Sequence, residues 1–248
     1  LTIAFIDLPH ISNFTDLDPL RNIPGLNLVP ILPESPAELL LEADACIIPG
    51  SKSVVADLAD LEQSGIAGRL KQYGSAERGL ILGICGGLQI LGAFIDDPYG
   101  IESAETRRAA LGMLPYTTTL AEKKATRLRE AFFEEYPDQV QQGYEIHHGK
   151  SDWGDLPPLL RSVEGAGNAG GEVLGVASPS GAIWATYLHG ILENPLFLNR
   201  FLNEAAERSG KPLPAAIPVY DLESRIDRFA DLVEESLDIE KIFALLKG

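Results

Sequence analysis

Cys85 is the residue best placed for chemistry, because it lies between glycines in the segment Gly83-Ile-Cys-Gly-Gly87. This G-x-C-x-G spacing between an apolar run and a helical pattern is typical of a nucleophile elbow, the sharp turn that holds a reactive side chain above the carboxyl edge of a parallel sheet. Free amide donors and the helix dipole at a helix N-terminus favour a thiolate. We therefore predict that Cys85 is a nucleophile, and the alternative is a buried structural cysteine.

A cysteine nucleophile needs a base, and the chain contains four histidines: His10, His147, His148 and His189. We predict that His189 is the base, because it follows a strand-like run, precedes a glycine and comes after the nucleophile in chain order. His147 and His148 are neighbours in an extended segment, so one is expected to line the site or an interface and the other to face away. His10 is assigned to a loop, and no metal site is predicted because no ligand spacing is convincing.

The elements that must position these residues alternate between strands and helices. Short apolar runs predict strands at residues 1–8, 26–32, 45–48 and 80–84. Helical spacing predicts a helix at 36–43, helical structure at 54–73 that is broken near Gly65, and a helix after the elbow that includes Phe94. Farther along, we expect one strand near 111–119 in a polar region, a strand at 140–149, a hairpin of 172–176 and 182–189, and a helix at 195–209. This order predicts an α/β fold with a doubly wound, mixed but mostly parallel sheet in three α/β/α layers.

The segment Pro49-Gly-Ser-Lys-Ser53 looks like the end of a phosphate-binding loop, but Ser51 and Cys46 occupy positions where that motif needs glycine. A nucleotide site is therefore rejected there. Instead, the amides of Gly50 or Ser51 could join the amide of Gly86 in an oxyanion hole.

Composition limits the classes of partner. Lys and Arg number 20 against 36 Asp and Glu, a net charge of −16, which argues against nucleic acid or an anionic membrane as the main partner. The longest apolar runs are too short for a membrane span, and two cysteines fit a reducing cytoplasm. Because Leu1 opens directly into a strand-like run, we expect the numbering to begin inside a longer polypeptide.

The sequence resembles class I (triad-type) glutamine amidotransferases in two signatures, residues 83–92 and 187–190. Within that class it is similar to the cobyric acid synthase branch of the cobalamin-biosynthesis amidases. The segments that carry this likeness are residues 11–19, 48–52, 111–115 and 143–149. The resemblance covers residues 1–210, the expected glutaminase domain, and 211–248 is expected to be a C-terminal helical extension that packs on the body or docks a partner.

The resemblance implies that Cys85 attacks the side-chain amide of glutamine and forms a thioester, with Gln89 contacting the glutamine. The released ammonia would amidate the b, d, e and g carboxylates of adenosylcobyrinic acid a,c-diamide. ATP and Mg would bind a preceding synthetase domain of the same polypeptide, so no cofactor is expected in this domain and the corrinoid is an indirect partner.

One position departs from the family pattern. Triad amidotransferases carry Glu two residues after the histidine, where this chain has Ile191, so a Cys-His dyad is one possibility. Glu145 and Glu193 are the expected candidates for orienting His189. Three alternative functions stay open: a glutaminase for another acceptor, such as cobyrinate a,c-diamide synthase or a peptidoglycan-precursor amidase; a cysteine hydrolase or peptidase; and a non-catalytic interaction module.

Overall fold

The computed structural model describes residues 1–163 and 171–246. The chain divides into two compact units, Leu1–Pro218 and Val219–Gly248. The first unit extends past the predicted boundary at residue 210, because Lys211 Nζ forms an ion pair with Asp44 at 2.8 Å and Ile217 packs against the core.

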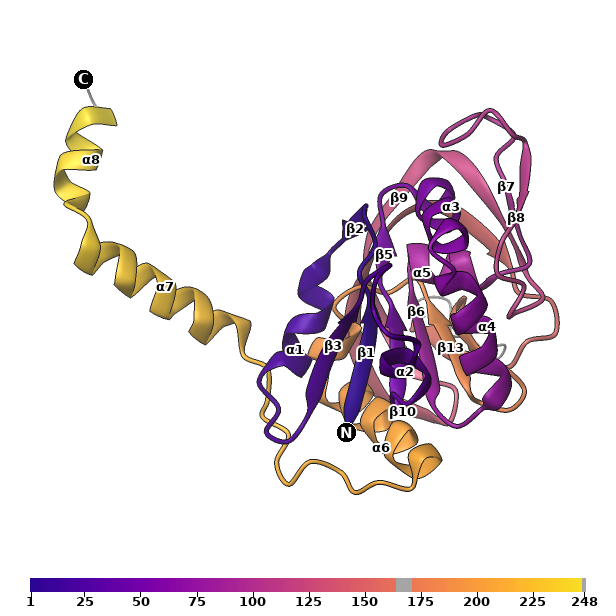
Figure 1. The fold of residues 1–248 in the computed structure, drawn as a ribbon. Helices are drawn as coiled ribbons and strands as arrows, with labels where there is room; N and C mark the ends of the chain where they lie inside the picture. Colours follow the sequence, from indigo (N-terminus) through magenta and orange to yellow (C-terminus); the bar gives the residue numbers. More distant parts are fainter. Residues whose placement is uncertain (164–170, 247–248) are drawn as a thin grey trace. The chain divides into compact units, whose positions relative to one another are not determined.

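The first unit is built on a mixed sheet of 11 strands within the described residues, in the order β3-β1-β4-β6-β13-β12-β11-β9-β7-β8, with β10 paired to β9 (Figure 1). Its strands are β1 (Thr2–Ile6), β3 (Asn27–Ile31), β4 (Ala45–Ile48), β6 (Leu80–Ile84), β7 (Phe94–Asp96), β8 (Arg107–Ala109), β9 (Thr117–Phe133), β10 (Tyr136–Asp152), β11 (Pro158–Ser162), β12 (Val173–Ala177) and β13 (Ile183–Thr186). A separate two-stranded sheet pairs β2 (Ile11–Ser12) with β5 (Gly50–Ser51). The run from β3 to β13 is parallel, so the carboxyl ends of its strands share one edge.

Helices cover both faces of the parallel strands. They are η1 (Phe14–Leu17), α1 (Asp18–Arg21), α2 (Ala37–Leu41), α3 (Val54–Gln63), α4 (Ile66–Ala76), α5 (Gly86–Leu91), η2 (Ile191–Glu193) and α6 (Pro195–Ser209). Two further helices, α7 (Leu222–Ser236) and α8 (Ile239–Leu246), belong to the second unit. Helices α2 to α5 pack on one face, and η1, α1, η2 and α6 pack on the other (Figure 1). This arrangement confirms the predicted α/β fold class.

The continuous apolar runs place side chains in the hydrophobic cores on both faces of the sheet. In β6, Ile81 joins the core under α3 and α4, whereas Leu80, Leu82 and Ile84 join the core under α6. Successive side chains of a strand point to opposite faces, so a strand covered on both sides is apolar at every position.

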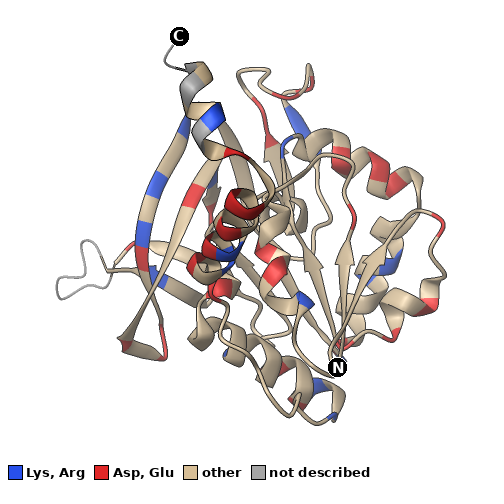
Figure 2. Ribbon diagram, turned by 90° about the vertical axis from the view of Figure 1, so that its left-hand side faces the viewer, with Lys and Arg blue, Asp and Glu red and all other residues tan. Residues whose placement is uncertain are grey.

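Several predicted elements had the wrong bounds, among them the elbow helix and the strand near residues 111–119. The helix after the elbow ends at Leu91, because Gly92 is extended (ψ 177°) and Phe94 begins β7. The single strand expected near residues 111–119 starts at Thr117 and runs to Phe133, paired with β10. The middle of β9 is polar and exposed. Its backbone groups pair with those of β10, so it forms a strand without a buried apolar face. Lys and Arg recur along this long pair of strands (Figure 2).

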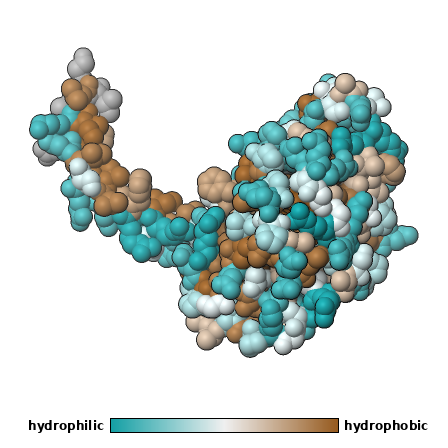
Figure 3. Space-filling model, in the orientation of Figure 1, coloured by the Kyte–Doolittle hydropathy of each residue, from teal (hydrophilic) through white to brown (hydrophobic). Residues whose placement is uncertain are grey.

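The second unit is helical. Asp221 caps α7 by accepting a hydrogen bond from Ser224 N at 3.0 Å. Apolar side chains gather along one side of α7 and α8 (Figure 3), including Leu222, Ile226 and Phe229. This unit is amphipathic, and its predicted role as an extension that packs or docks stays a prediction.

Candidate active site

Cys85 lies in the turn between β6 and α5. Its φ of 51° and ψ of −102° are unusual for a residue with a side chain, and its amide donates to Thr186 O at 2.8 Å. The thiol is 4% exposed and approaches the carbonyl oxygen of Ile146 at 3.8 Å. A strained residue between a strand and a helix, at the carboxyl edge of a parallel sheet, is the expected geometry of a nucleophile elbow.

Gly87 is a glycine that this turn requires. A Cβ there would overlap the carbonyl oxygen of Ile48 and lie 2.9 Å from Pro49 O, and both atoms belong to backbone that cannot rotate away. The same close approach brings the end of β4 against α5, so the loop after β4 runs beside the nucleophile.

We expect Gly87→Ala to lower the free energy of unfolding by about 3 kcal/mol, because forcing an atom into packed backbone shifts the elbow. Gly68→Ala is the matched control: Gly68 lies in α4, a Cβ there meets no atom within 4 Å, and the change is expected to be neutral or stabilising by up to about 1 kcal/mol. Urea unfolding of both variants measures the difference. Equal midpoints would contradict the close packing of the elbow.

His189 follows β13 and is 0% exposed. Its Nδ1 donates to Asp16 Oδ2 at 2.7 Å, and the amide of Gly190 donates to Asp16 Oδ1 at 2.7 Å. The ring of Tyr144 stacks on the imidazole with centroids 5.3 Å apart. A proton held on Nδ1 leaves Nε2 as the nitrogen that can exchange protons, and Nε2 is buried with no regular hydrogen bond among the described residues.

The pKa of His189 reflects three influences. Burial lowers the pKa, but hydrogen bonding to Asp16 and the proximity of Cys85 outweigh it and raise the pKa to about 9. A raised pKa favours the imidazolium, so His189 is set to hold a proton at neutral pH beside Cys85.

Asp16 is the residue that accepts the hydrogen bond from His189 Nδ1. The predicted orienting residues, Glu145 and Glu193, do not make this hydrogen bond. Asp16 is 2% exposed and lies in η1, where its amide donates to Asn13 O. Glu145 instead accepts from Arg129 Nε at 2.6 Å. Glu193 lies near Asp16, and burial together with that neighbouring charge raises its pKa.

The predicted oxyanion residues lie together at the elbow. A Cβ on Gly86 would lie 2.5 Å from Ser51 N, and a Cβ on Gly50 would lie 2.9 Å from His189 Cε1. The backbone of β5 therefore lies close to both the start of α5 and the imidazole of His189. The amide nitrogen of Ser51 thus lies against Gly86, the residue that follows Cys85.

Gln89, one helical turn beyond Cys85, is 3% exposed. Its side chain contacts Gly149 and hydrogen-bonds with Tyr187. Burial raises the pKa of Tyr187 to about 12, so its hydroxyl stays protonated, and it lies 2.8 Å from Ser151 Oγ. The predicted substrate-contacting position is thus part of a buried polar group beside the nucleophile.

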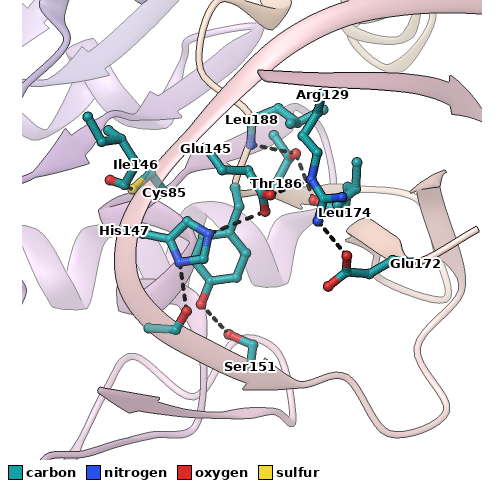
Figure 4. A network of polar contacts seen from close by, with 12 residues as sticks. Cys85, Arg129, Glu145, Ile146, His147, Ser151, Glu172, Leu174, Thr186 and Leu188 are labelled. Carbon is teal, nitrogen blue, oxygen red and sulfur yellow. Dashed lines mark hydrogen bonds and ion pairs between the residues drawn. The ribbon is translucent and has the colours of Figure 1, made fainter. Parts of the chain in front are cut away.

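A cavity of about 510 Å³ lies over this group. Tyr187 and Gly149, which the side chain of Gln89 contacts, belong to its lining. Its wall is a chain of charged groups: Arg129 donates to Glu145 and Glu172, and Glu145 Oε1 lies 3.2 Å from His147 Nε2 (Figure 4). Hydrogen bonding to His147 and Arg129 outweighs burial and lowers the pKa of Glu145, so this carboxylate is ionised.

Both neighbouring histidines line the cavity, contrary to the expectation that one would face away. The ring of His147 stacks on Tyr187 with centroids 3.9 Å apart, and His148 Nδ1 lies 3.0 Å from Ala121 O. The register of β10 against β9 shifts between His147 and Gly149, and this β-bulge breaks the alternation of faces.

His10 lies before β2, where its Nδ1 donates to Asp57 Oδ1 at 2.8 Å. Within residues 1–163 and 171–246, His10, Asp57 and Asp60 form one group with potential ligand atoms within 4.8 Å of one another. Hydrogen bonds from Ser51 and His10 already engage both oxygens of Asp57. No helix in the described residues is long and apolar enough to cross a membrane.

The sequence of residues 2–197 matches the family described as the CobB/CobQ-like glutamine amidotransferase domain. The chain belongs to this family. Among curated relatives, the cobyric acid synthase of Clostridium botulinum (strain ATCC 19397 / Type A) is 35% identical over 249 residues, which cover 99% of this chain and 50% of the relative. The cobyric acid synthase of Microcystis aeruginosa is 40% identical over 252 residues, 99% of this chain and 49% of the relative.

This CobB/CobQ-like domain thus spans about half the length of the curated relatives it matches, and it is a glutamine amidotransferase domain by homology. Two solved structures share its fold. A glutamine amidotransferase has a TM-score of 0.61 at 18% identity, covering 84% of this chain and 98% of that one. PurLQS from Thermotoga maritima has a TM-score of 0.57 at 17% identity, covering 84% of this chain and 96% of its own.

Proposed function

We propose that this chain is the glutaminase half of a cobyric acid synthase, which hydrolyses glutamine and passes the ammonia to a synthetase half. The single observation that carries the glutaminase chemistry is the alignment of Cys85, His189 and Asp16 at the carboxyl edge of the parallel strands. The choice of acceptor is supported by the relatives, which are cobyric acid synthases of twice this length.

In the first half of the reaction, the Cys85 thiolate attacks the side-chain carbonyl carbon of glutamine. The carbonyl oxygen becomes an oxyanion, and the amides of Gly86 and Ser51 donate to it. Each such donor is worth about 10²–10³ in rate. The His189 imidazolium gives its proton to the departing nitrogen, so that ammonia leaves and a thioester remains on Cys85.

In the second half, neutral His189 takes a proton from water, and the resulting hydroxide attacks the thioester carbon. Glutamate leaves, the thiolate of Cys85 reforms and His189 keeps the proton for the next cycle. Asp16 holds Nδ1–H throughout, so that the same Nε2 serves as acid and then as base.

The charged head of glutamine fits the cavity beside Gln89. An amino acid presents one carboxylate and one ammonium, and the lining offers cations from Lys123, Arg127 and Lys150 together with anions from Glu145 and Glu172. In a chain of net charge −16, such a gathering of cations is a specific feature of this wall. The reactive amide then points toward Cys85.

The ammonia serves amidation of the b, d, e and g carboxylates of a corrinoid a,c-diamide. Carboxylate amidation needs activation as an acyl phosphate, which we assign with ATP and Mg to the synthetase half, while this domain uses no cofactor. Both cysteines are free thiols, which suits a reaction in the reducing cytoplasm.

Glutamate release from glutamine tests the glutaminase step. The chain is expected to release glutamate from glutamine but not from asparagine, and a diazoketone analogue of glutamine is expected to label Cys85, with glutamine protecting. Ester or peptide hydrolysis without glutamine turnover would instead support a cysteine hydrolase. The absence of both turnover and labelling would support a non-catalytic module.

The acceptor is tested separately, with the synthetase half, ATP, Mg and adenosylcobyrinic acid a,c-diamide. Mass increments for amidated corrinoid, in step with glutamate release, are the expected result. Amidation of cobyrinic acid or of a peptidoglycan precursor instead would overturn the acceptor and leave the glutaminase step in place.

A further inference from the structure

Asp57 is a carboxylate with 0% exposure in α3, a helix whose other buried positions are Val54, Leu58 and Leu61. A buried charge is costly unless hydrogen bonds compensate it. Here Asp57 Oδ2 accepts from Ser51 Oγ at 2.5 Å, and Oδ1 accepts from the amide of His10 at 3.1 Å and from its Nδ1 at 2.8 Å. The carboxylate therefore joins the two segments that form the small β2–β5 sheet.

These bonds fix the loop after β4 at several points. Ser51 Oγ also accepts from Ser53 N at 2.9 Å, and Lys52 N donates to His10 O at 2.8 Å. Ser51 is thus anchored through its side chain, while its amide nitrogen lies against Gly86 beside the nucleophile. Asp57 lies outside the hydrogen-bonded pair of His189 and Asp16.

We propose that Asp57 is a positioning residue for the oxyanion hole: it holds Ser51 through the hydroxyl so that the Ser51 amide meets the oxyanion of the tetrahedral intermediate. This inference rests on the proposed glutaminase function. Asp57 makes no contact with substrate, and its effect is confined to the step in which the carbonyl oxygen gains charge. A misplacement of about 1 Å in such a donor costs about 10²-fold in rate.

The test compares two variants that release Ser51, Asp57→Ala and Ser51→Ala, with Asp60→Ala. Asp60 is an exposed acidic residue of the same helix, three positions on, and serves as the matched control. Two rates are measured for each folded variant: kcat and KM for glutamine, and the rate at which iodoacetamide alkylates Cys85. Alkylation displaces iodide from carbon and develops no oxyanion, so it reports the thiolate alone.

We expect kcat to fall about 10–100-fold in Asp57→Ala and about 10-fold in Ser51→Ala, with KM and the alkylation rate within about twofold of wild type. Asp60→Ala should match wild type in all three. If Asp57→Ala does not fold, as judged by circular dichroism, Ser51→Ala alone decides, because it keeps every backbone group.

An unchanged kcat in a folded variant would overturn the inference, and so would an equal fall in turnover and alkylation, which would place the effect on Cys85 itself. Failure of the proposed function looks different: wild-type protein would then release no glutamate, whatever the state of Asp57.

Discussion

Cys85→Ala is expected to reduce glutamine hydrolysis at least about 10³-fold, to the background of the assay. The variant keeps the elbow, the oxyanion amides and His189, but it has no atom that can form the thioester. Non-covalent binding of glutamine should persist, because the cavity beside Gln89 is unchanged. Glutamate release and glutamine binding by calorimetry together separate lost chemistry from lost binding.

Cys46→Ala is the matched control for that variant. Cys46 lies in β4 at 0% exposure, and burial raises the pKa of its thiol far above the ordinary value, so it is protonated and shielded. We expect this variant to keep full turnover and to lose about 1 kcal/mol of stability from the missing sulfur. Labelling of Cys46 by the diazoketone, or loss of turnover in Cys46→Ala alone, would refute Cys85 as the nucleophile.

The parts of the site that the sequence predicts are those encoded locally. The apolar run of β6, the glycines of the elbow and the spacing of α5 are neighbours in the chain, and they define the turn at Cys85 without long-range information. His189 could be placed because strand ends of a parallel sheet share one edge. Such features depend on periodicity and backbone conformation, which a single sequence carries.

Asp16 was missed because its partner lies 173 residues away. Two signals pointed to this region without singling out Asp16. Residues 11–19 carry part of the family likeness, and they form a polar loop after the first parallel strand, an edge where ligand contacts are usual. The residues expected to orient His189 were Glu145 and Glu193, and neither takes His189 Nδ1. The predicted strand near residues 111–119 is much shorter than β9, because the exposed middle of β9 has no apolar face that a pattern could reveal. No local pattern marks the bulge that turns both His147 and His148 to the cavity.

Three buried carboxylates divide the work of positioning this site. Asp16 holds the imidazole, Asp57 holds Ser51 in the proposed oxyanion loop, and Glu145 holds Arg129 and His147 in the cavity wall. Each accepts at least two hydrogen bonds, which compensates for its removal from water. An acidic chain thus uses part of its charge inside the fold, where each carboxylate fixes a different group around the substrate.

Asp16→Asn is expected to lower kcat about 10²–10⁴-fold, because an amide cannot accept from both Nδ1–H of His189 and the amide of Gly190 as the carboxylate does. The ring then loses its fixed tautomer. KM for glutamine should change little, since Asp16 is buried behind the imidazole. Glu193→Gln removes a neighbouring carboxylate and is the matched control, with kcat expected within about threefold of wild type.

The pH dependence of kcat/KM should also change in a defined direction in Asp16→Asn. Asp16 raises the pKa of His189 and burial lowers it, so removing the carboxylate moves that pKa down from about 9. The alkaline limb of kcat/KM should therefore shift to lower pH in Asp16→Asn. The stabilisation from the His189–Asp16 ion pair is fully present below the pKa of an unfolded histidine and is lost as pH rises through about 9. The difference in melting temperature between wild type and Asp16→Asn should therefore be largest near pH 6 and should shrink above pH 9. A lower kcat with an unmoved alkaline limb would mean that Asp16 supports the fold of η1 and not the charge on His189.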